Sequence, residues 1–298
     1  MKQRTIIYAV LGIVGIGLAG ALYAYDQLSV KETTVSELSR ETHFHGIAVD
    51  AINPRRLYLA THHGLFAVTL DGKAGRLSDT RDDFMGFTAH PIDQSALYAS
   101  GHPTGGGNLG FIASRDGGRS WIRRSNGAGG PADFHLMDVS KTDPKIVYGV
   151  FGDLQLTTNG GRTWMRIGPV PPGITALAAS SQDINILYAA TQSGLQRSHS
   201  GGRSWKLESN HPTTMVHVTR DSRVYAYMVG IGLVKAAENE FAWQIVGQGF
   251  GEDHIQYFAT DAVDYRRLYA ITTNPRTQTQ RVIASTDGGA SWKALGGM

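Results

Sequence analysis

Short segments in which hydrophobic and polar residues alternate, separated by glycine-containing turns, repeat along the chain after residue 40. Alternation with a period of two, as in residues 46–49, is typical of a half-buried β-strand. An aliphatic residue followed by tyrosine marks one strand of each repeat, at Leu57-Tyr58, Leu97-Tyr98, Val147-Tyr148, Leu187-Tyr188, Val224-Tyr225 and Leu268-Tyr269. These tyrosines are 40, 50, 40, 37 and 44 residues apart. Repeats of about 40 to 50 residues with four short strands are typical of β-propeller blades, so we expect an all-β, six-bladed propeller, or seven blades if residues 26–41 supply one more.

A glycine-rich turn followed by tryptophan recurs in four of the repeats. It reads SRDGGRSW at 114–121, TTNGGRTW at 157–164, SHSGGRSW at 198–205 and STDGGASW at 285–292. Its third residue is Asp116, Asn159, Ser200 or Asp287, and its last is Trp121, Trp164, Trp205 or Trp292. A short polar side chain at the third position accepts hydrogen bonds from the turn's own N–H groups, and glycine supplies a positive φ. We therefore expect a structural role for these turns.

These four turns resemble the Asp-box, or bacterial neuraminidase repeat, of sialidase, sortilin and photosystem-assembly propellers. The segments THHGLF (61–66), DFMGF (83–87), GHP (101–103), NLGF (108–111) and DFH (133–135) are further similar to a bacterial exported Asp-box family commonly labelled glycosylhydrolase. The resemblance covers most of the chain after residue 40 and implies the propeller fold. Membership of a fold does not by itself transmit an activity.

The N-terminus carries an uncharged stretch of 21 residues, 5–25, behind Lys2 and Arg4. As a helix this stretch would span about 31 Å, which is enough to cross a bilayer. The basic residues in front of it predict a cytoplasmic N-terminus and an exported remainder. A cleaved signal peptide is the competing interpretation, because Ala19-Gly20-Ala21 offers a small-residue cleavage pattern, and it would leave a secreted or periplasmic protein. We expect an anchor or signal peptide over 1–25, a stalk over 26–41 that donates one strand to the globular part, and the propeller over 42–298.

Composition narrows the partners and the chemistry. The chain of 298 residues has 28 basic and 25 acidic side chains, and no run of five basic residues appears, so nucleic acid is not an expected partner. Cysteine is absent from the sequence. That excludes disulfides, thiolate zinc sites and iron–sulfur clusters.

A second repeated pattern supplies the candidate site. The innermost strands of three successive repeats are predicted to begin at HFHG (43–46), DFMG (83–86) and DFHL (133–136). His45, Met85 and His135 occupy equivalent positions, and His43, Asp83 and Asp133 lie two residues earlier. In the loop after the tyrosine strand, His62, followed by His63, is equivalent to His102. Strand direction places all these positions on one face of a propeller, opposite the glycine-rich turns, so we expect them to gather around one mouth of the channel.

Several imidazoles and a thioether with no thiolate point to a transition metal, copper before zinc. The predicted metal residues are His43, His45, His62, His63, Met85, His102 and His135, with Asp83 and Asp133 as alternative acceptors that orient the rings. Two other functions stay open. One is glycoside hydrolysis by Asp83 and Asp133 across a cleft, since glycosidases need two carboxyl groups. The other is a scaffold that binds a membrane-protein partner, which the predicted anchor and the photosystem-assembly relatives suggest.

Overall fold

The computed structural model describes residues 33–296. The predicted anchor or signal peptide over 1–25 and the first part of the predicted stalk lie outside the described residues. Within the described part of the chain, no helix is long and apolar enough to cross a membrane.

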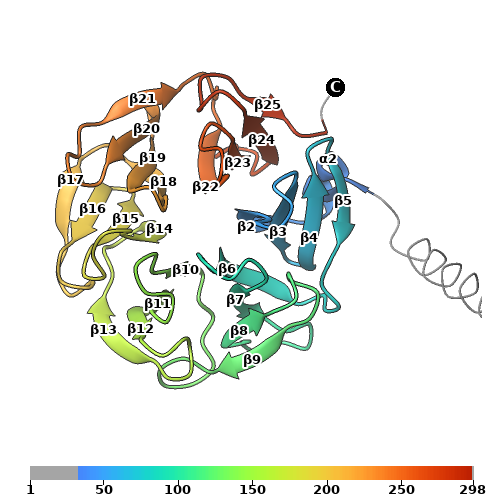
Figure 1. The fold of residues 1–298 in the computed structure, drawn as a ribbon, viewed down its shortest axis with the longest axis vertical. Coiled ribbons are helices and arrows are strands. Elements are labelled where there is room, and N and C mark those ends of the chain that lie inside the picture. Colours follow the sequence, from blue (N-terminus) through green and yellow to red (C-terminus); the bar gives the residue numbers. More distant parts are fainter. Residues whose placement is uncertain (1–32, 297–298) are drawn as a thin grey trace, which may run out of the picture. The chain divides into compact units, whose positions relative to one another are not determined.

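Six antiparallel sheets stand around a central axis as the blades of a propeller (Figure 1). Blade 1 comprises β2 (Phe44–Val49), β3 (Arg56–Thr61), β4 (Gly64–Thr69) and β5 (Lys73–Arg76). Blade 2 comprises β6 (Asp83–Ala89), β7 (Leu97–His102), β8 (Phe111–Ser114) and β9 (Ile122–Ser125). Blade 3 comprises β10 (Leu136–Val139), β11 (Val147–Phe151), β12 (Asp153–Thr157) and β13 (Met165–Pro169). Blade 4 comprises β14 (Ile174–Ala179), β15 (Leu187–Thr191), β16 (Gly194–Ser198) and β17 (Lys206–Ser209). Blade 5 comprises β18 (Thr213–Val218), β19 (Arg223–Met228), β20 (Gly232–Ala237) and β21 (Gln244–Gly247). Blade 6 comprises β22 (His254–Thr260), β23 (Leu268–Thr273), β24 (Gln280–Ser285) and β25 (Lys293–Ala294). The prediction of six blades is confirmed.

The repeated aliphatic–tyrosine pair joins neighbouring blades. It lies on the second strand of each blade, where successive side chains point to opposite faces of the sheet. Tyr58 of blade 1 shares a buried cluster with Leu97 of blade 2. The same arrangement recurs at every blade interface, and Tyr269 of blade 6 meets Leu57 of blade 1. Each pair therefore packs against both neighbours of its blade.

The four glycine-rich turns connect the third and fourth strands of their blades. In the first of them, the Gly118 N–H donates to the Ser114 hydroxyl at 2.8 Å, and the Ser120 hydroxyl donates to Asp116 at 2.6 Å. Asn159 and Ser200 replace the aspartate without loss of this closure, through contacts of 2.8 Å to Thr163 and 2.9 Å to Ser204. All these hydrogen bonds lie within the turns, as a structural role requires.

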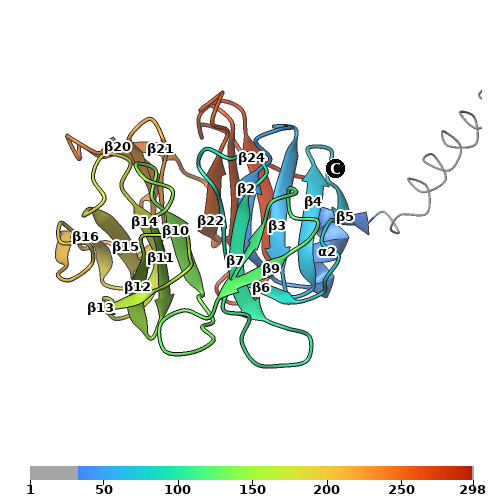
Figure 2. The same cartoon turned by 60° about the horizontal axis from the view of Figure 1, so that its bottom comes forward.

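Residues 33–41 belong to the first blade. The strand β1 (Thr33–Thr34) pairs with the outer strand β5, and the helix α2 (Val35–Glu41) follows it at the outer edge of the blade (Figures 1 and 2). Thr34 and Glu37 form a capping box that begins the helix. Val35 and Leu38, both 3% exposed, pack with Ile271 and Val282 of blade 6. The helix thus covers the seam between the first and last blades.

A buried glutamine completes this seam. The Phe44 N–H donates to the Gln280 side-chain oxygen at 2.7 Å, and the Gln280 amide nitrogen donates to the Phe44 carbonyl at 3.1 Å. One side chain from β24 therefore satisfies both polar backbone groups of the first residue of β2. Since the sheets of the described residues exchange no strand, this bond pair supplies polar contacts that help to close the ring.

We predict that Gln280→Ala lowers the free energy of unfolding by about 1–3 kcal/mol, because it leaves two buried backbone groups unpaired. Urea unfolding followed by tryptophan fluorescence measures the change. Gln244→Ala, on the exposed face of β21, is the matched control and should stay within about 0.5 kcal/mol of the parent protein. Equal stability of the two variants would contradict a role for Gln280 in closing the ring.

Candidate metal centre

One rim of the propeller carries the candidate residues. The inner strands β2, β6 and β10 run away from this rim, and the loops after β3 and β7 return to it. The glycine-rich turns lie at the other rim, where the Gly117 N–H donates to Ser95 in the turn between β6 and β7. The strand directions therefore place the candidate histidines and the glycine-rich turns at opposite rims, as the sequence predicts.

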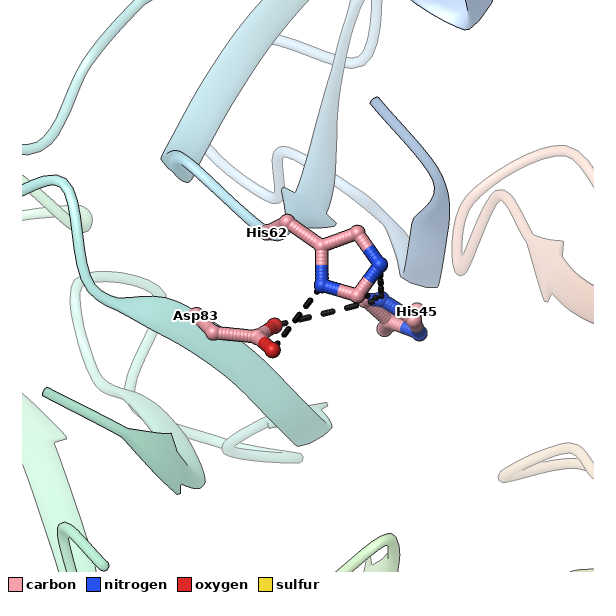
Figure 3. A group of neighbouring side chains, drawn as sticks. All are labelled: His45, His62 and Asp83. Carbon is pink, nitrogen blue, oxygen red and sulfur yellow. Dashed lines mark hydrogen bonds and ion pairs between the residues drawn. The ribbon is translucent and has the colours of Figure 1, made fainter. Parts of the chain in front are cut away.

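The first candidate group consists of His45, His62 and Asp83 (Figure 3). His45 lies on β2, His62 in the turn after β3, and Asp83 at the start of β6 in the next blade. His62 Nδ1 is 2.9 Å from Asp83 Oδ2, and His45 Nε2 is 3.2 Å from His62 Nε2. His45 Nε2 is also 3.9 Å from Asp83 Oδ1. The three side chains thus point toward a common centre formed between two blades.

The second group consists of His102, Asp133 and His135. His102 ends β7, while Asp133 and His135 precede β10 in the next blade. Asp133 Oδ2 is 3.1 Å from His102 Nε2 and 2.5 Å from His135 Nε2. The other nitrogen of His102, Nδ1, is 2.9 Å from the Gly107 carbonyl, which fixes the ring and its tautomer. The loop that contains Gly107 therefore orients the His102 ring.

Both groups are built on the same pair. In each, a histidine from the loop after the second strand meets the aspartate that begins the next blade, as His62 meets Asp83 and His102 meets Asp133. The third member differs, because His45 comes from the blade that supplies the loop and His135 from the blade that supplies the aspartate. The two groups consequently flank blade 2 on either side.

Each aspartate leaves one oxygen unused. Asp83 Oδ1 and Asp133 Oδ1 are buried and have no hydrogen-bond partner within the described residues. A buried carboxylate oxygen without a partner costs free energy unless a cation or a donor meets it. The same unsatisfied atom occurs at the equivalent position in two blades. That repetition favours a shared requirement for a positively charged ligand.

The protonation of the rings differs between the groups. Burial and the neighbouring His62 ring lower the pKa of His45 to about 4, although Asp83 acts in the opposite direction. At neutral pH, His45 therefore offers a free nitrogen lone pair. The hydrogen bond to Asp133 raises the pKa of His135. A cation at this second group would compete with the proton on His135.

The other predicted ligands lie at the margin of the two groups. The His43 side chain is exposed, with its ring centroid 5.7 Å from that of His62. His63 is exposed too, and its backbone N–H donates to Thr61. Met85 is half-buried on β6, at the blade that separates the groups. The histidines and aspartates of the predicted cluster form two neighbouring groups of imidazole and carboxylate, which still act on each other: the charge of His135 lowers the pKa of His45, and that of Asp83 raises the pKa of His135.

A central cavity of about 430 Å³ connects the rims, and His45 and His135, one from each group, line it. His217 on β18 faces the same cavity and was not singled out from the sequence. Its ring lies against Phe258, with a centroid distance of 5.6 Å, and Nε2 is 3.5 Å from the Thr260 hydroxyl. Burial lowers the pKa of His217 to about 3, and the positive charge of Lys141 acts in the same direction.

No family model matches the sequence, and no curated protein matches it. Solved structures do resemble the fold. A GH74 xyloglucanase from Xanthomonas campestris superposes with a TM-score of 0.58 and 17% identity over 89% of this chain and 46% of its own. A protein of unknown function from Bacteroides thetaiotaomicron gives 0.61 and 12% over 86% and 71%. YCF48 bound to a D1 peptide gives 0.51 and 12% over 89% and 84%.

These similarities show a shared β-propeller fold. The chain spans less than half the length of the GH74 structures that it matches, between 36% and 46% of each. A common fold at such low identity says nothing of substrate or partner, since unrelated functions recur on propellers. The chemistry of this chain has to be argued from its own residues.

We predict that His217 makes the protein less stable in acid. Above pH 6.5 the imidazole is neutral whether the chain is folded or not, so the effect is absent. Below pH 6.5 the unfolded chain takes up a proton that the folded chain does not accept until its pKa of about 3, so stability falls with pH. Between pH 7 and pH 5, the His217→Gln protein should therefore lose roughly 2 kcal/mol less stability than the parent protein.

Urea unfolding of both proteins at pH 7, 6 and 5 measures this difference. Other histidines such as His45 affect both proteins in the same way, so the comparison isolates position 217. A parallel loss of stability in the two proteins would contradict the assignment.

Proposed function

We propose that this propeller binds divalent transition-metal ions, one in each His₂Asp group, with copper preferred over zinc. The observation that carries the proposal is the unpartnered buried oxygen of Asp83, repeated at Asp133, beside two imidazoles in each case. An aspartate, a loop histidine and a second histidine thus recur as a unit in neighbouring blades.

The donor set suits such ions. Within each group the ligand atoms lie within 4.8 Å of one another, so a metal–ligand distance of about 2.0–2.2 Å needs only small movements of the side chains. Imidazole and carboxylate together suit copper, zinc and iron, and copper(II) binds such donors most tightly of the divalent first-row metals. Three protein ligands leave coordination positions open for water or a further ligand. Met85 lies on blade 2, between the groups, and its thioether would favour copper further if it approached either ion.

The N-terminal sequence supports a place for this site outside the cytoplasm. The uncharged stretch 5–25 behind Lys2 and Arg4 predicts export of the propeller, either anchored in the membrane or released. An oxidising compartment is compatible with a chain that has no cysteine. We accordingly propose metal binding at the outer surface of a membrane or in the periplasm.

We predict that the untagged full-length protein, purified from copper-supplemented cells, holds about two metal ions per chain. The variant His62→Ala should lose one ion and the variant His102→Ala the other, because each substitution disrupts a single group. The double variant should hold about none. Inductively coupled plasma mass spectrometry of the dialysed proteins, with competition between copper and zinc, measures occupancy and preference.

His199→Ala is the matched control, since His199 is exposed at the opposite rim. It should retain both ions. Circular dichroism and thermal unfolding report whether each variant is folded. Full metal content in folded His62→Ala/His102→Ala protein would overturn the proposal, as would the absence of metal from the parent protein at micromolar copper.

The hydrolase alternative uses the same aspartates. Each carboxylate already faces two imidazoles, which is the arrangement of a ligand group. A panel of chromogenic glycosides tests hydrolysis directly. Turnover by the parent protein that is lost in Asp83→Asn and in Asp133→Asn would favour catalysis over metal binding.

The scaffold alternative is compatible with a metal. YCF48 was solved with a D1 peptide bound, and its fold resembles this one. Pull-down from membranes with and without a chelator would show whether a protein partner depends on the metal. A partner that binds equally well to the His62→Ala/His102→Ala variant would be independent of the site.

A further inference from the structure

Blades 1 and 6 share a construction at the histidine rim. The pairing of β2 with β3 shifts by one residue at His45, and the pairing of β22 with β23 shifts in the same way at Gln256. Such a bulge re-aims the side chain of the extra residue. Four positions after the repeated tyrosine, His62 in blade 1 corresponds to Thr273 in blade 6. Gln256 and Thr273 therefore occupy in blade 6 the positions of the two histidines of the first group.

A small cavity lies beside these two residues. It has a volume of about 90 Å³ and lies between blades 6 and 1, next to the first group. A cavity of this size admits a molecule of a few non-hydrogen atoms. We call it the seam pocket, and its lining includes His43, His45, Gln256, Tyr257, Thr273 and Gln280. Because His45 belongs to both, a molecule in the seam pocket would contact a residue of the first group.

The side-chain oxygens of Gln256 and Gln280 are already used. The Thr273 hydroxyl donates to Gln256 Oε1 at 2.6 Å, and the Phe44 N–H donates to Gln280 Oε1 at 2.7 Å. The Gln256 amide nitrogen and the Tyr257 hydroxyl, by contrast, make no hydrogen bond within residues 33–296. Burial raises the pKa of Tyr257 to about 12, so its hydroxyl keeps its proton at neutral pH. The seam pocket therefore offers hydrogen-bond donors to a ligand.

His45 supplies a further donor. Its Nε2 faces the first group, 3.2 Å from His62 Nε2, so a cation bound there leaves the ring proton on Nδ1. Figure 3 shows Nδ1 on the side of the ring away from Asp83, and no acceptor in the described part of the chain meets it. Histidines that bind metals almost always donate their other N–H, as His102 Nδ1 does to the Gly107 carbonyl at 2.9 Å. The first group lacks the support that the second group has.

Exposure to water distinguishes His45 from His135. The second ring nitrogen of His135 also meets no acceptor among the described residues, but its side chain is 58% exposed, so water can accept that bond. The His45 side chain is only 13% exposed. An N–H that is largely withdrawn from solvent needs a partner nearby. The seam pocket, which His45 lines, is the space in which a ligand can supply one.

The chemistry of the seam pocket selects its ligand. Donors on His45, Gln256 and Tyr257 suit a molecule that accepts several hydrogen bonds, and none of the described residues that line the pocket is acidic. An ion in the first group would add positive charge on the other side of the His45 ring. A carboxylate suits both conditions, whereas an amide of the same size brings N–H groups to a pocket whose glutamine oxygens are used. The exposed side chains of His43 and Gln278 also line the pocket, so a ligand can enter from solution.

We propose that the seam pocket binds a small carboxylate, such as acetate, that accepts hydrogen bonds from His45 Nδ1, Gln256 and Tyr257. The anion holds the His45 ring in place and thereby strengthens metal binding by the first group. This inference rests on the proposed function, since the metal ion supplies part of the attraction. The second group does not depend on the carboxylate, because the Gly107 carbonyl already holds His102.

The two single variants of the metal groups permit a direct test. The full-length His102→Ala protein keeps the first group, and the His62→Ala protein keeps the second. Competition with a chromophoric chelator at neutral pH gives the copper dissociation constant of each, in sodium acetate and in sodium chloride of equal ionic strength. Acetate should lower the dissociation constant of His102→Ala about tenfold, because the partner of a ligating histidine contributes about 10–100-fold to metal affinity. It should leave that of His62→Ala unchanged.

A change of ligand and a change in the pocket complete the test. Acetamide should leave the copper affinity of His102→Ala unchanged. When Tyr257→Phe is added to this variant, the acetate concentration that gives half of the effect should rise about tenfold, because one hydrogen bond to a charged group is lost. Tyr265→Phe, in the turn between β22 and β23 at the opposite rim, is the matched control and should leave the response to acetate unchanged. Circular dichroism reports whether each variant is folded.

The outcomes separate the carboxylate site from the metal site. Copper binding by His102→Ala that does not respond to acetate would overturn the carboxylate site alone. An equal response of His102→Ala and His62→Ala would overturn it as well, because acetate would then act on the copper ions themselves. An equal effect of acetamide would exclude a carboxylate as the preferred ligand. Absence of copper from both folded variants would overturn the proposed function, and this inference with it.

Discussion

The packing of an aliphatic residue and a tyrosine between neighbouring blades is the interaction on which the rest of this structure depends. Within residues 33–296 the sheets exchange no strand, and a chain without cysteine has no disulfide, so side-chain burial and a few hydrogen bonds hold the ring closed. Tyr58, Tyr188 and Tyr269 are each at most 2% exposed. A fully buried large side chain contributes about 1.5–3 kcal/mol, and a pair at each of the interfaces makes the closed ring cooperative.

The candidate metal groups are a consequence of that ring. His62 and Asp83 belong to different blades, as do His102 and Asp133, so neither group exists within a single sheet. Their geometry depends on the spacing that the interblade cores set. Variants that loosen the seam or an interface should therefore disturb both groups without any change in their own residues.

Repetition also separates structural from functional residues. The glycine-rich turns vary between Asp116, Asn159 and Ser200 while their hydrogen bonds persist, which identifies a structural requirement that several polar residues meet. The candidate ligand histidines, by contrast, are confined to blades 1 to 3, so the same fold forms in the other blades without them. Where a repeat departs from its neighbours at no benefit to folding, as at His102 compared with Gln192 in the equivalent loop of blade 4, the departure marks a candidate ligand.

The number of blades, the position of the glycine-rich turns and the rim that carries the histidines could be predicted from the sequence, because period, turn chemistry and strand direction are local properties of the chain. The sequence also identified Asp83 and Asp133, as alternative ring-orienting acceptors. Only the tertiary structure divided the histidines into two groups, placed an aspartate in each and left His43 and His63 at the margin. It also showed Gln280 at the seam and His217 in the cavity. Those outcomes depend on side-chain directions and on distances between blades. Both are fixed only when the ring closes, and the neighbours of a residue along the chain do not specify them.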